Sequence, residues 1–296
     1  MLHDRYGWWI ADAAAAGLAG APLPGLAAGE VVDADVVVIG GGYCGLWAAW
    51  EAAEAGARVV VLEAERCGFG PSGRNGGFVN SLWLSLPALA ERYGADAGRA
   101  VAMASLESVG AIGDWCAAEG VDAWFRPAGH PVLSAAPAQD GVSADAVDGD
   151  EVVALDAAAA RAICDSPLWR GGVLAKTAAT VHPARLAFGL RDRLVARGVR
   201  IFEGARVRAL RGSVAEVEGG GTVRAGAAVL AVNARAAALR PLRHRLTVSS
   251  SHIVMTEPVP DVLDALGWTG GEPITDGRAL LHYFRTTNDG RILFGW

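Results

Sequence analysis

The chain has 296 residues, of which 52% are hydrophobic and 20% charged, a composition typical of a folded globular protein rather than a disordered one. This length allows one large domain or two closely joined domains. The formal net charge of −6 provides no basic surface, so we expect no nucleic-acid partner.

The cysteines and the apolar stretches indicate the cellular setting. The four cysteines are far apart in the sequence, with no C-x-x-C pair, so we expect buried, reduced thiols and no metal site. No apolar run reaches the roughly 18 residues of a transmembrane helix. Residues 8–28 are apolar, but Asp12, Pro22 and Pro24 interrupt them and argue against a signal peptide. We therefore expect a cytoplasmic protein in which residues 1–32 form a leader packed across the first domain.

The first predicted unit is a strand, a glycine turn, a helix and a second strand. Residues 35–39 are a β-branched run without a polar break, which predicts a strand buried on both faces. A helix is predicted at about residues 43–55, and a second buried strand at residues 58–62 ends on Glu63. This order of elements is a βαβ unit.

Gly40, Gly42 and Gly45 have the G-x-G-x-x-G spacing of a dinucleotide-binding turn. Gly40 permits the tight turn, Gly42 lets a pyrophosphate approach the backbone, and Gly45 lets the helix pack closely on the strand. The helix N-terminus offers N–H groups and the positive end of its dipole to the phosphates. Glu63 is placed to accept hydrogen bonds from a ribose hydroxyl, and its charge disfavours a 2′-phosphate. The motif predicts a dinucleotide site without distinguishing FAD from NAD.

A second glycine-rich stretch follows at residues 64–78. Five glycines lie within ten of its residues, which excludes a regular helix or strand. Such a loop beside a dinucleotide site can bring N–H groups and small side chains against a cofactor, and Arg74 and Asn75 add a cation and an amide. An ordinary surface connection is the alternative.

The rest of the chain predicts a second lobe and then a return to βαβ organisation. Helices are predicted at residues 88–93, 96–119, 155–163 and 184–197, and strands at 123–126, 131–134, 199–202, 205–210, 227–233, 246–256, 280–287 and 291–294. A polar loop is predicted at residues 137–150 and a hairpin turn at 288–290. His182, just before a proline, is interpreted as a structural capping residue rather than a general acid or base.

Six segments carry a resemblance to a known family. They are GGGYCGLWAA at residues 40–49, PSGRNGGFV at 71–79, the helix-and-strand segment at 178–207, AVNA at 231–234, MTEP at 255–258 and HYFRTTNDGRILFG at 282–295. In this order they resemble the D-amino-acid oxidase (DAO) superfamily of FAD-dependent oxidoreductases, and in particular its γ-glutamylputrescine oxidase-like and glycine oxidase-like branch. The SGRNGG loop and the order of the later segments are the most specific part of the resemblance.

The resemblance implies FAD as the cofactor and assigns residues to its parts. Gly40, Gly42 and Gly45 would face the pyrophosphate, Glu63 the adenosine ribose, and the backbone of Val207 the adenine. Six residues of the glycine-rich loop would line the cofactor near its flavin end: Ser72, Gly73, Arg74, Asn75, Gly76 and Gly77.

Tyr283 and Arg285 resemble the residues that point into the substrate cavity of the family. They alternate along a predicted strand and therefore share one face. The planar guanidinium of Arg285 suits a substrate carboxylate. A solvent-facing strand with a packed tyrosine is the alternative.

The fold class implied by the resemblance is α/β, with a discontinuous Rossmann-like FAD-binding domain and a second α+β substrate domain of mainly antiparallel sheet. We expect the FAD-binding domain at residues 33–120 and 170–238, and part of the substrate domain at 121–169 and 239–296. Members of the family continue well past the match to Gly295, so we expect this chain to be truncated, with the C-terminal part of the fold missing.

The expected function is oxidation of a C–N bond in a small-molecule amine or amino acid. Hydride would pass from the substrate carbon to the flavin, the resulting imine would be hydrolysed, and oxygen or another acceptor would take the electrons. One alternative is a truncated, non-catalytic FAD-binding remnant or partner subunit. Another is an NAD-dependent dehydrogenase, in which the SGRNGG loop would have no role.

Overall fold

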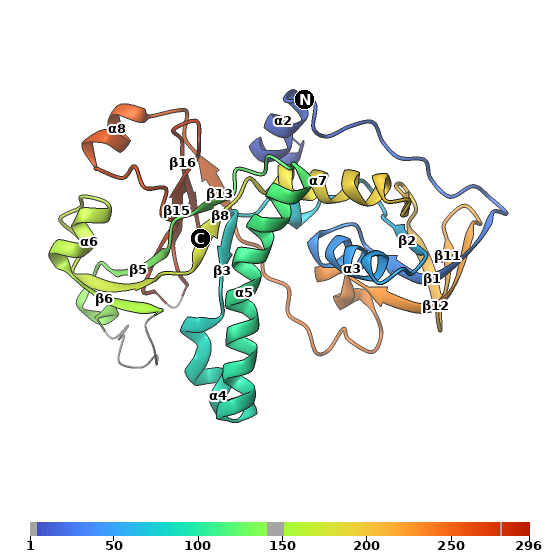
Figure 1. Ribbon diagram of the computed structural model, residues 1–296, viewed down its shortest axis with the longest axis horizontal. Coiled ribbons are helices and arrows are strands. Elements are labelled where there is room, and N and C mark those ends of the chain that lie inside the picture. The colour runs from blue at the N-terminus through green and yellow to red at the C-terminus, as the bar shows by residue number, and fades with distance from the viewer. Residues whose placement is uncertain (1–4, 141–150, 279) are drawn as a thin grey trace. The chain divides into compact units, whose positions relative to one another are not determined.

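The computed structural model describes residues 5–140, 151–278 and 280–296, and contacts within the chain divide it into two compact units (Figure 1). The first unit comprises the residues up to Asn75 together with Pro183–Ser250, and the second comprises Gly76–His182 together with Ser251–Trp296. The backbone therefore passes between the units three times. The predicted domains were defined by which of them would bind the cofactor or the substrate, whereas these units are defined by contacts within the chain. The predicted domain ranges therefore stay a prediction.

A six-stranded sheet forms the core of the first unit, in the order β10-β11-β12-β1-β2-β9. Its strands are β1 (Val31–Ile39), β2 (Val59–Leu62), β9 (Arg200–Phe202), β10 (Val207–Arg211), β11 (Val214–Val217) and β12 (Thr222–Leu230). Strands β12, β1, β2 and β9 are parallel, and β10 and β11 add an antiparallel edge. Every residue of β2 is buried, as its unbroken apolar run predicts.

The described helices of the first unit are α2 (Trp8–Ala15), α3 (Tyr43–Glu54) and α7 (Pro183–Ala196), with short 3₁₀ turns at Pro71–Gly73 and Asn233–Ala238. Helix α3 contacts β1 and β2, so strand, helix and second strand form the predicted βαβ unit. Helix α7 contacts both α3 and α2. The N-terminal segment is thus packed on this unit, with Trp9, Ile10 and Ala13 of α2 buried.

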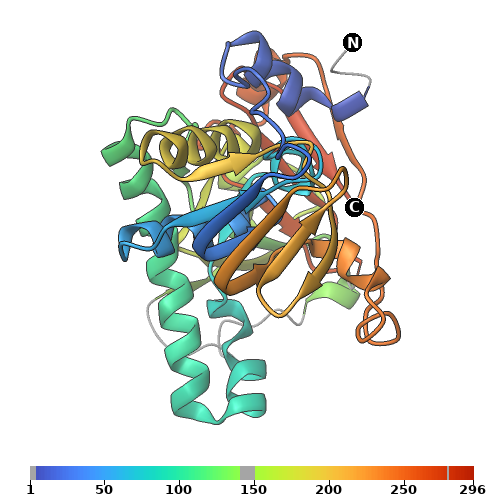
Figure 2. The ribbon, with the colours of Figure 1, turned by 90° about the vertical axis from the view of Figure 1, so that its right-hand side faces the viewer.

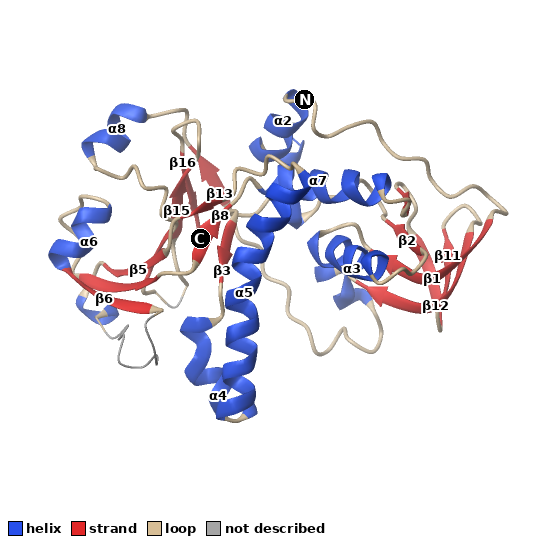
Figure 3. Ribbon diagram, viewed as in Figure 1, coloured by secondary structure: helices blue, strands red, loops and turns tan. Residues whose placement is uncertain are grey.

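The second unit contains a seven-stranded sheet in the order β13-β16-β15-β14-β5-β7-β6 (Figure 3). Its strands are β5 (His130–Ser134), β6 (Val152–Asp156), β7 (Gly171–Ala175), β13 (Ile253–Met255), β14 (Ile274–Asp276), β15 (Tyr283–Thr286) and β16 (Ile292–Gly295). Neighbouring strands are antiparallel except for the parallel pair β14 and β5. A separate three-stranded sheet joins β3 (Phe78–Asn80), β8 (Ala178–Thr180) and β4 (Arg126–Pro127).

Helices α4 (Leu86–Tyr93) and α5 (Ala95–Glu119) of the second unit form a helical hairpin (Figures 1 and 2). Gly94 joins them at φ 85°, and Gly120 ends α5 in the left-handed conformation that glycine adopts readily. Two short helices, α6 (Ala157–Ile163) and α8 (Pro260–Ala265), complete the described helices of this unit. Within the described residues, none of the helices combines the length and the apolar character that crossing a membrane requires.

Four predicted strands are wrong, shifted or shortened, among them the one at residues 227–233, because β12 ends at Leu230 and a 3₁₀ turn begins at Asn233. Of residues 123–126 only Arg126 belongs to a strand, because Trp124 has φ 52°, which a β-strand does not allow. The strand predicted at residues 246–256 is limited to β13, and the one predicted at 280–287 to β15. Strands β3, β6, β7, β8, β11 and β14 were not predicted from the sequence, and of these β11 alternates partly buried and buried residues over four positions.

Two further differences concern the middle of the chain. The helix predicted from residue 155 begins at Ala157, because Asp156 caps it: Oδ1 accepts a hydrogen bond of 2.8 Å from the N–H of Ala159. The predicted polar loop at residues 137–150 begins with a 3₁₀ turn at Pro137–Gln139, and its part at 141–150 lies outside the described residues.

Candidate functional site

The glycine turn follows β1 directly, at the carboxyl end of the parallel strands. Gly40 has φ 110°, and a Cβ built on it would collide with the carbonyl oxygen of Ala231. A Cβ on Gly45 would collide with the carbonyl oxygen of Gly40, and one on Gly42 would lie 2.8 Å from Oγ of Ser72. Backbone oxygens therefore exclude a side chain at Gly40 and Gly45, and a Cβ on Gly42 would displace the hydroxyl of Ser72.

The N-terminus of α3 receives its cap from another segment. Gly42, the N-cap residue, supplies no side-chain acceptor. Instead, the N–H of Tyr43 donates a 2.9 Å hydrogen bond to Oγ of Ser72. The first N–H groups of a helix have no partner within the helix, and together with the dipole they favour an anion. A phosphate would thus be bound beside the hydroxyl of Ser72.

Glu63 lies at the same edge, immediately after β2. Its Oε2 accepts a 2.7 Å hydrogen bond from the N–H of Gly41, and its Oε1 accepts one of 2.8 Å from the N–H of Glu65. Each carboxylate oxygen can accept a second bond, so a ribose hydroxyl can still be bound. The carbonyl of Glu63 accepts from the N–H of Ala205 (2.8 Å), two residues before Val207, which begins β10.

Arg74 and Asn75 make hydrogen bonds within their own loop. Nδ2 of Asn75 donates to the carbonyl of Ser72 at 2.8 Å and to that of Pro71 at 3.2 Å, and Nε of Arg74 donates to the carbonyl of Gly70 at 3.3 Å. These bonds hold the turn that presents Ser72. This edge combines backbone N–H groups, the anchored carboxylate of Glu63 and the hydroxyl of Ser72, which are the groups that binding an adenine dinucleotide requires.

The other predicted residues lie in the second unit, where Arg285 is 1% exposed. Its Nη1 donates to the carbonyls of Gly77 (2.9 Å) and Val181 (2.8 Å), and its Nε donates to the carbonyl of Thr286 (3.0 Å). Burial, and next the charge of Arg126, lower the pKa of Arg285 to about 9. The guanidinium thus joins β15 to the segments beside β3 and β8. Its predicted contact with a substrate carboxylate stays a prediction.

Tyr283 is half-buried on the same face of β15. Its ring lies edge-on to Phe78 at 5.6 Å, and its hydroxyl is 2.9 Å from Oγ of Ser251. A Cβ on Gly76 would lie 3.0 Å from the ring, and one on the paired Gly295 would collide with it. The structure therefore brings Gly76, Tyr283 and Gly295 together. The roles of Ser251 and Gly295 were not predicted, because Gly295 meets Tyr283 through strand pairing and Ser251 lies 32 positions before it in the chain.

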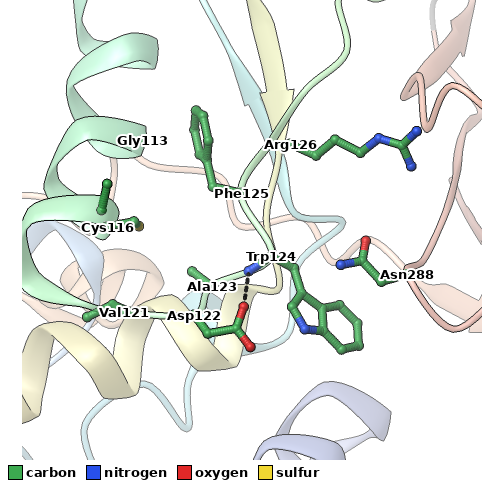
Figure 4. A pocket seen from close by; sticks show the side chains of 10 residues that line it. Gly113, Cys116, Val121, Asp122, Ala123, Trp124, Phe125, Arg126 and Asn288 are labelled. Carbon is green, nitrogen blue, oxygen red and sulfur yellow. Dashed lines mark hydrogen bonds between the residues drawn. The ribbon is translucent and has the colours of Figure 1, made fainter.

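A cavity of about 780 Å³ lies elsewhere in the second unit, and neither Tyr283 nor Arg285 lines it (Figure 4). Figure 4 shows Cys116 on the helix side of the cavity and Asn288 on the opposite side. Between them lies Trp124, whose ring is edge-on to the fully buried His182 at 4.9 Å. Burial raises the pKa of Cys116 to about 11, so its thiol stays protonated at neutral pH.

The family model described as "DAO: FAD dependent oxidoreductase" matches residues 35–296. The chain is similar to the gamma-glutamylputrescine oxidoreductase of Escherichia coli strain K12, with 32% identity over 276 residues, which are 90% of this chain and 65% of that protein. The chain thus spans 65% of the length of the first curated relatives that it matches.

Two solved structures illustrate the fold. The glycine oxidase of Bacillus cereus ATCC 14579 is similar at a TM-score of 0.68 with 20% identity, covering 88% of this chain and 70% of that one. The L-amino acid deaminase of Proteus vulgaris, with its specific insertion deleted, is similar at a TM-score of 0.65 with 16% identity, covering 93% and 69%. The predicted fold class, a mixed α/β unit with a mainly antiparallel second unit, is confirmed.

Proposed function

Because the chain belongs to the DAO family of FAD-dependent oxidoreductases, we propose that it binds FAD and oxidises a C–N bond of a small amine or amino acid. The observation that carries the proposal is the edge of the first unit at which the glycine turn lies beside the hydroxyl of Ser72. FAD, when bound, would accept a hydride from the substrate carbon that carries the nitrogen.

The residues of this chain bind and orient the cofactor and the substrate. N–H groups of the glycine turn and of α3 bind the phosphates, Glu63 binds the ribose, and the backbone of Val207 binds the adenine. Tyr283 and Arg285 are the proposed substrate-side residues, and Arg285 also holds Gly77 in place. Because the cofactor supplies the difficult step, the proposal needs no protein base.

The names of the relatives support the substrate class. One names a γ-glutamyl conjugate of a diamine, one names glycine and one names L-amino acids. Each of these molecules carries an amine, and each also carries a carboxylate. We therefore propose a small amine that carries a carboxylate as the substrate, with oxygen or another acceptor taking the electrons.

The direct test is a visible absorption spectrum of the purified chain, before and after FAD is added and the protein desalted. Retained flavin bands support the cofactor, and their bleaching by γ-glutamylputrescine, glycine or an L-amino acid in the absence of oxygen supports the reaction. Retained flavin that no amine bleaches would favour the alternative, FAD binding without catalysis. Protein that retains no flavin contradicts the proposal.

A matched pair of variants tests the assigned role of Glu63. We expect Glu63→Gln to weaken FAD binding about tenfold, because a hydrogen bond to a charged group contributes roughly 1.5–3 kcal/mol. Glu216→Gln is the control, since Glu216 lies on β11, between β10 and β12, and pairs with the exposed Arg208 and Arg211. Isothermal titration with FAD measures both dissociation constants. Equal values for Glu63→Gln and wild type would remove Glu63 from the site.

A further inference from the structure

A buried carboxylate lies behind the cofactor loop, which we define as residues 67–75 of the first unit. Glu203 directly follows β9, and its side chain is 2% exposed. Nε of Arg66 lies 3.6 Å from its Oε2, and Nη1 of the equally buried Arg191 lies 3.9 Å from its Oε1. Burying charged groups costs free energy unless hydrogen bonds and opposite charges compensate them. None of the three side chains is among the residues assigned to FAD, so their burial calls for a different role.

The carboxylate of Glu203 binds two segments that are far apart in the sequence. Oε1 accepts a 2.9 Å hydrogen bond from the N–H of Cys67, in the cofactor loop. Oε2 accepts one of 2.9 Å from the N–H of Leu23. Leu23 belongs to the N-terminal strap, which we define as residues 5–28. One side chain therefore holds the strap and the loop together.

The two arginines bind the strap as well. Nη1 of Arg191 donates to the carbonyl of Ala19 at 2.7 Å. Nη2 of Arg66 donates to the carbonyls of Ala19 at 2.8 Å and Gly20 at 3.0 Å. The cations that neutralise Glu203 are thus oriented by backbone carbonyls of the strap.

The loop side of the cluster leads to the glycine turn. Sγ of Cys67 lies 2.5 Å from the position that a Cβ on Gly41 would occupy, and the N–H of Gly68 donates to the carbonyl of Gly41 at 2.9 Å. Burial, and next the nearby charges of Glu203 and Glu63, raise the pKa of the Cys67 thiol. The thiol that packs on the glycine turn is therefore uncharged.

The strap also packs on the loop through apolar side chains. Ile10, which is fully buried in α2, lies 3.5 Å from the position of a Cβ on Gly73. The ring of Tyr6 is edge-on to Phe69 at 4.9 Å. Movement of the strap would therefore uncover the loop that presents Ser72.

We propose that Glu203 is a positioning residue that couples docking of the N-terminal strap to the conformation of the cofactor loop, and through that loop to retention of FAD. Its last step rests on the proposed function. Because one carboxylate accepts hydrogen bonds from both segments, loss of one segment weakens the hold on the other. Coupling of this kind is reciprocal, so FAD bound at the loop also protects the strap.

Hydrogen exchange of the purified protein, read by mass spectrometry, tests the coupling with or without FAD. In Glu203→Gln an amide donor faces one of the two N–H groups, and Arg66 and Arg191 lose the carboxylate of Glu203, while Asp192 still pairs with Arg191 at 2.7 Å. We expect the amides of the strap at 19–21 and 23 and those of the loop at 67–70, 72 and 73 to exchange ~10-fold faster, and the dissociation constant for FAD to rise ~10-fold. Glu216→Gln, another glutamate between two arginines, leaves all three unchanged.

A milder variant keeps the test decisive if Glu203→Gln does not fold. Leu23→Pro removes the N–H that bonds Glu203, together with a partly buried leucine side chain, at a position already flanked by Pro22 and Pro24. We expect faster exchange not only in the strap but also at residues 67–73, with weaker FAD binding. Ala21→Pro places a proline at an exposed position of the same strap and is the control.

The outcomes separate this inference from the proposed function. Wild-type protein that binds no FAD contradicts the proposed function, whereas the exchange of the loop still reports the coupling. Normal FAD binding with loop exchange unchanged in both Leu23→Pro and Glu203→Gln overturns the coupling alone. Faster exchange confined to the strap also overturns it, because Glu203 would then have a purely local structural role.

Discussion

A single methyl group distinguishes a required glycine from a dispensable one in this chain. A Cβ on Gly45, in α3, would collide with the carbonyl oxygen of Gly40 and lie 3.1 Å from Cγ1 of Val38, whereas a Cβ on Gly110, in α5, would meet nothing within 4 Å. We expect Gly45→Ala to lower the free energy of unfolding by about 2 kcal/mol through overpacking. We expect Gly110→Ala to raise it by about 0.5–1 kcal/mol. Urea unfolding measures both, and a shift of the same sign would contradict the packing argument.

The residues of the candidate site were predictable to different degrees. The spacing of Gly40, Gly42 and Gly45 specifies a turn, because each glycine role is local to the chain. Arg285 shows the limit: period-2 alternation places it on one face with Tyr283, but its carbonyl partners belong to segments more than 100 positions away. No local pattern records that such a cation would be buried among backbone oxygens.

At the scale of elements, α3 depends on a cap from outside itself. The hydroxyl oxygen of Ser72 accepts a hydrogen bond from the N–H of Tyr43, because the N-cap residue Gly42 has no side chain that could accept one. We expect Ser72→Ala to lower the free energy of unfolding by about 1 kcal/mol, the usual cost of losing a helix cap, and to weaken FAD binding as well. Ser108→Ala, on the exposed surface of α5, is the control for loss of a hydroxyl. Unchanged stability of Ser72→Ala would mean that water replaces the cap at no cost.

Long periodic elements were predicted better than short ones. Helices α3, α5 and α7 each begin and end within one residue of the prediction, because a repeating apolar face and a terminal glycine define them. Residues 123–125 show why β-like composition misleads: the left-handed backbone of Trp124 lets the chain turn there, and the indole packs on His182. Tertiary contacts override local preference at such positions.

At the scale of the whole molecule, both sheets join segments that are far apart in the chain, since β1 pairs with β12 in the first unit and β14 with β5 in the second. The βαβ order of β1, α3 and β2 follows directly from consecutive segments. In the seven-stranded sheet, β14 pairs with β5, about 140 positions earlier in the chain. That order could be predicted only through resemblance to a family, since apolar patterns identify strands but do not identify their partners.

His130, on β5, makes the stability of this second sheet sensitive to acid. It is 7% exposed, its Nε2 lies 3.0 Å from Oγ1 of Thr275 on β14, and burial lowers its pKa to about 4 from the ordinary 6.5. Below pH 6.5 the imidazole of His130 is therefore protonated in the unfolded chain, whereas in the folded chain it stays neutral down to about pH 4. Unfolding thus becomes easier as the pH falls through this window, by about 2 kcal/mol between pH 7 and pH 5.

The variant His130→Gln distinguishes the titration of His130 from that of every other ionisable group in the chain. Glutamine can still bond the hydroxyl of Thr275 but binds no proton, so we expect its free energy of unfolding to fall by about 2 kcal/mol less than that of the wild type between pH 7 and pH 5. Urea unfolding at the two pH values measures the difference. His252→Gln, at an exposed position, should retain the wild-type pH dependence. If His130→Gln also retains the wild-type pH dependence, the acid sensitivity arises from groups other than His130.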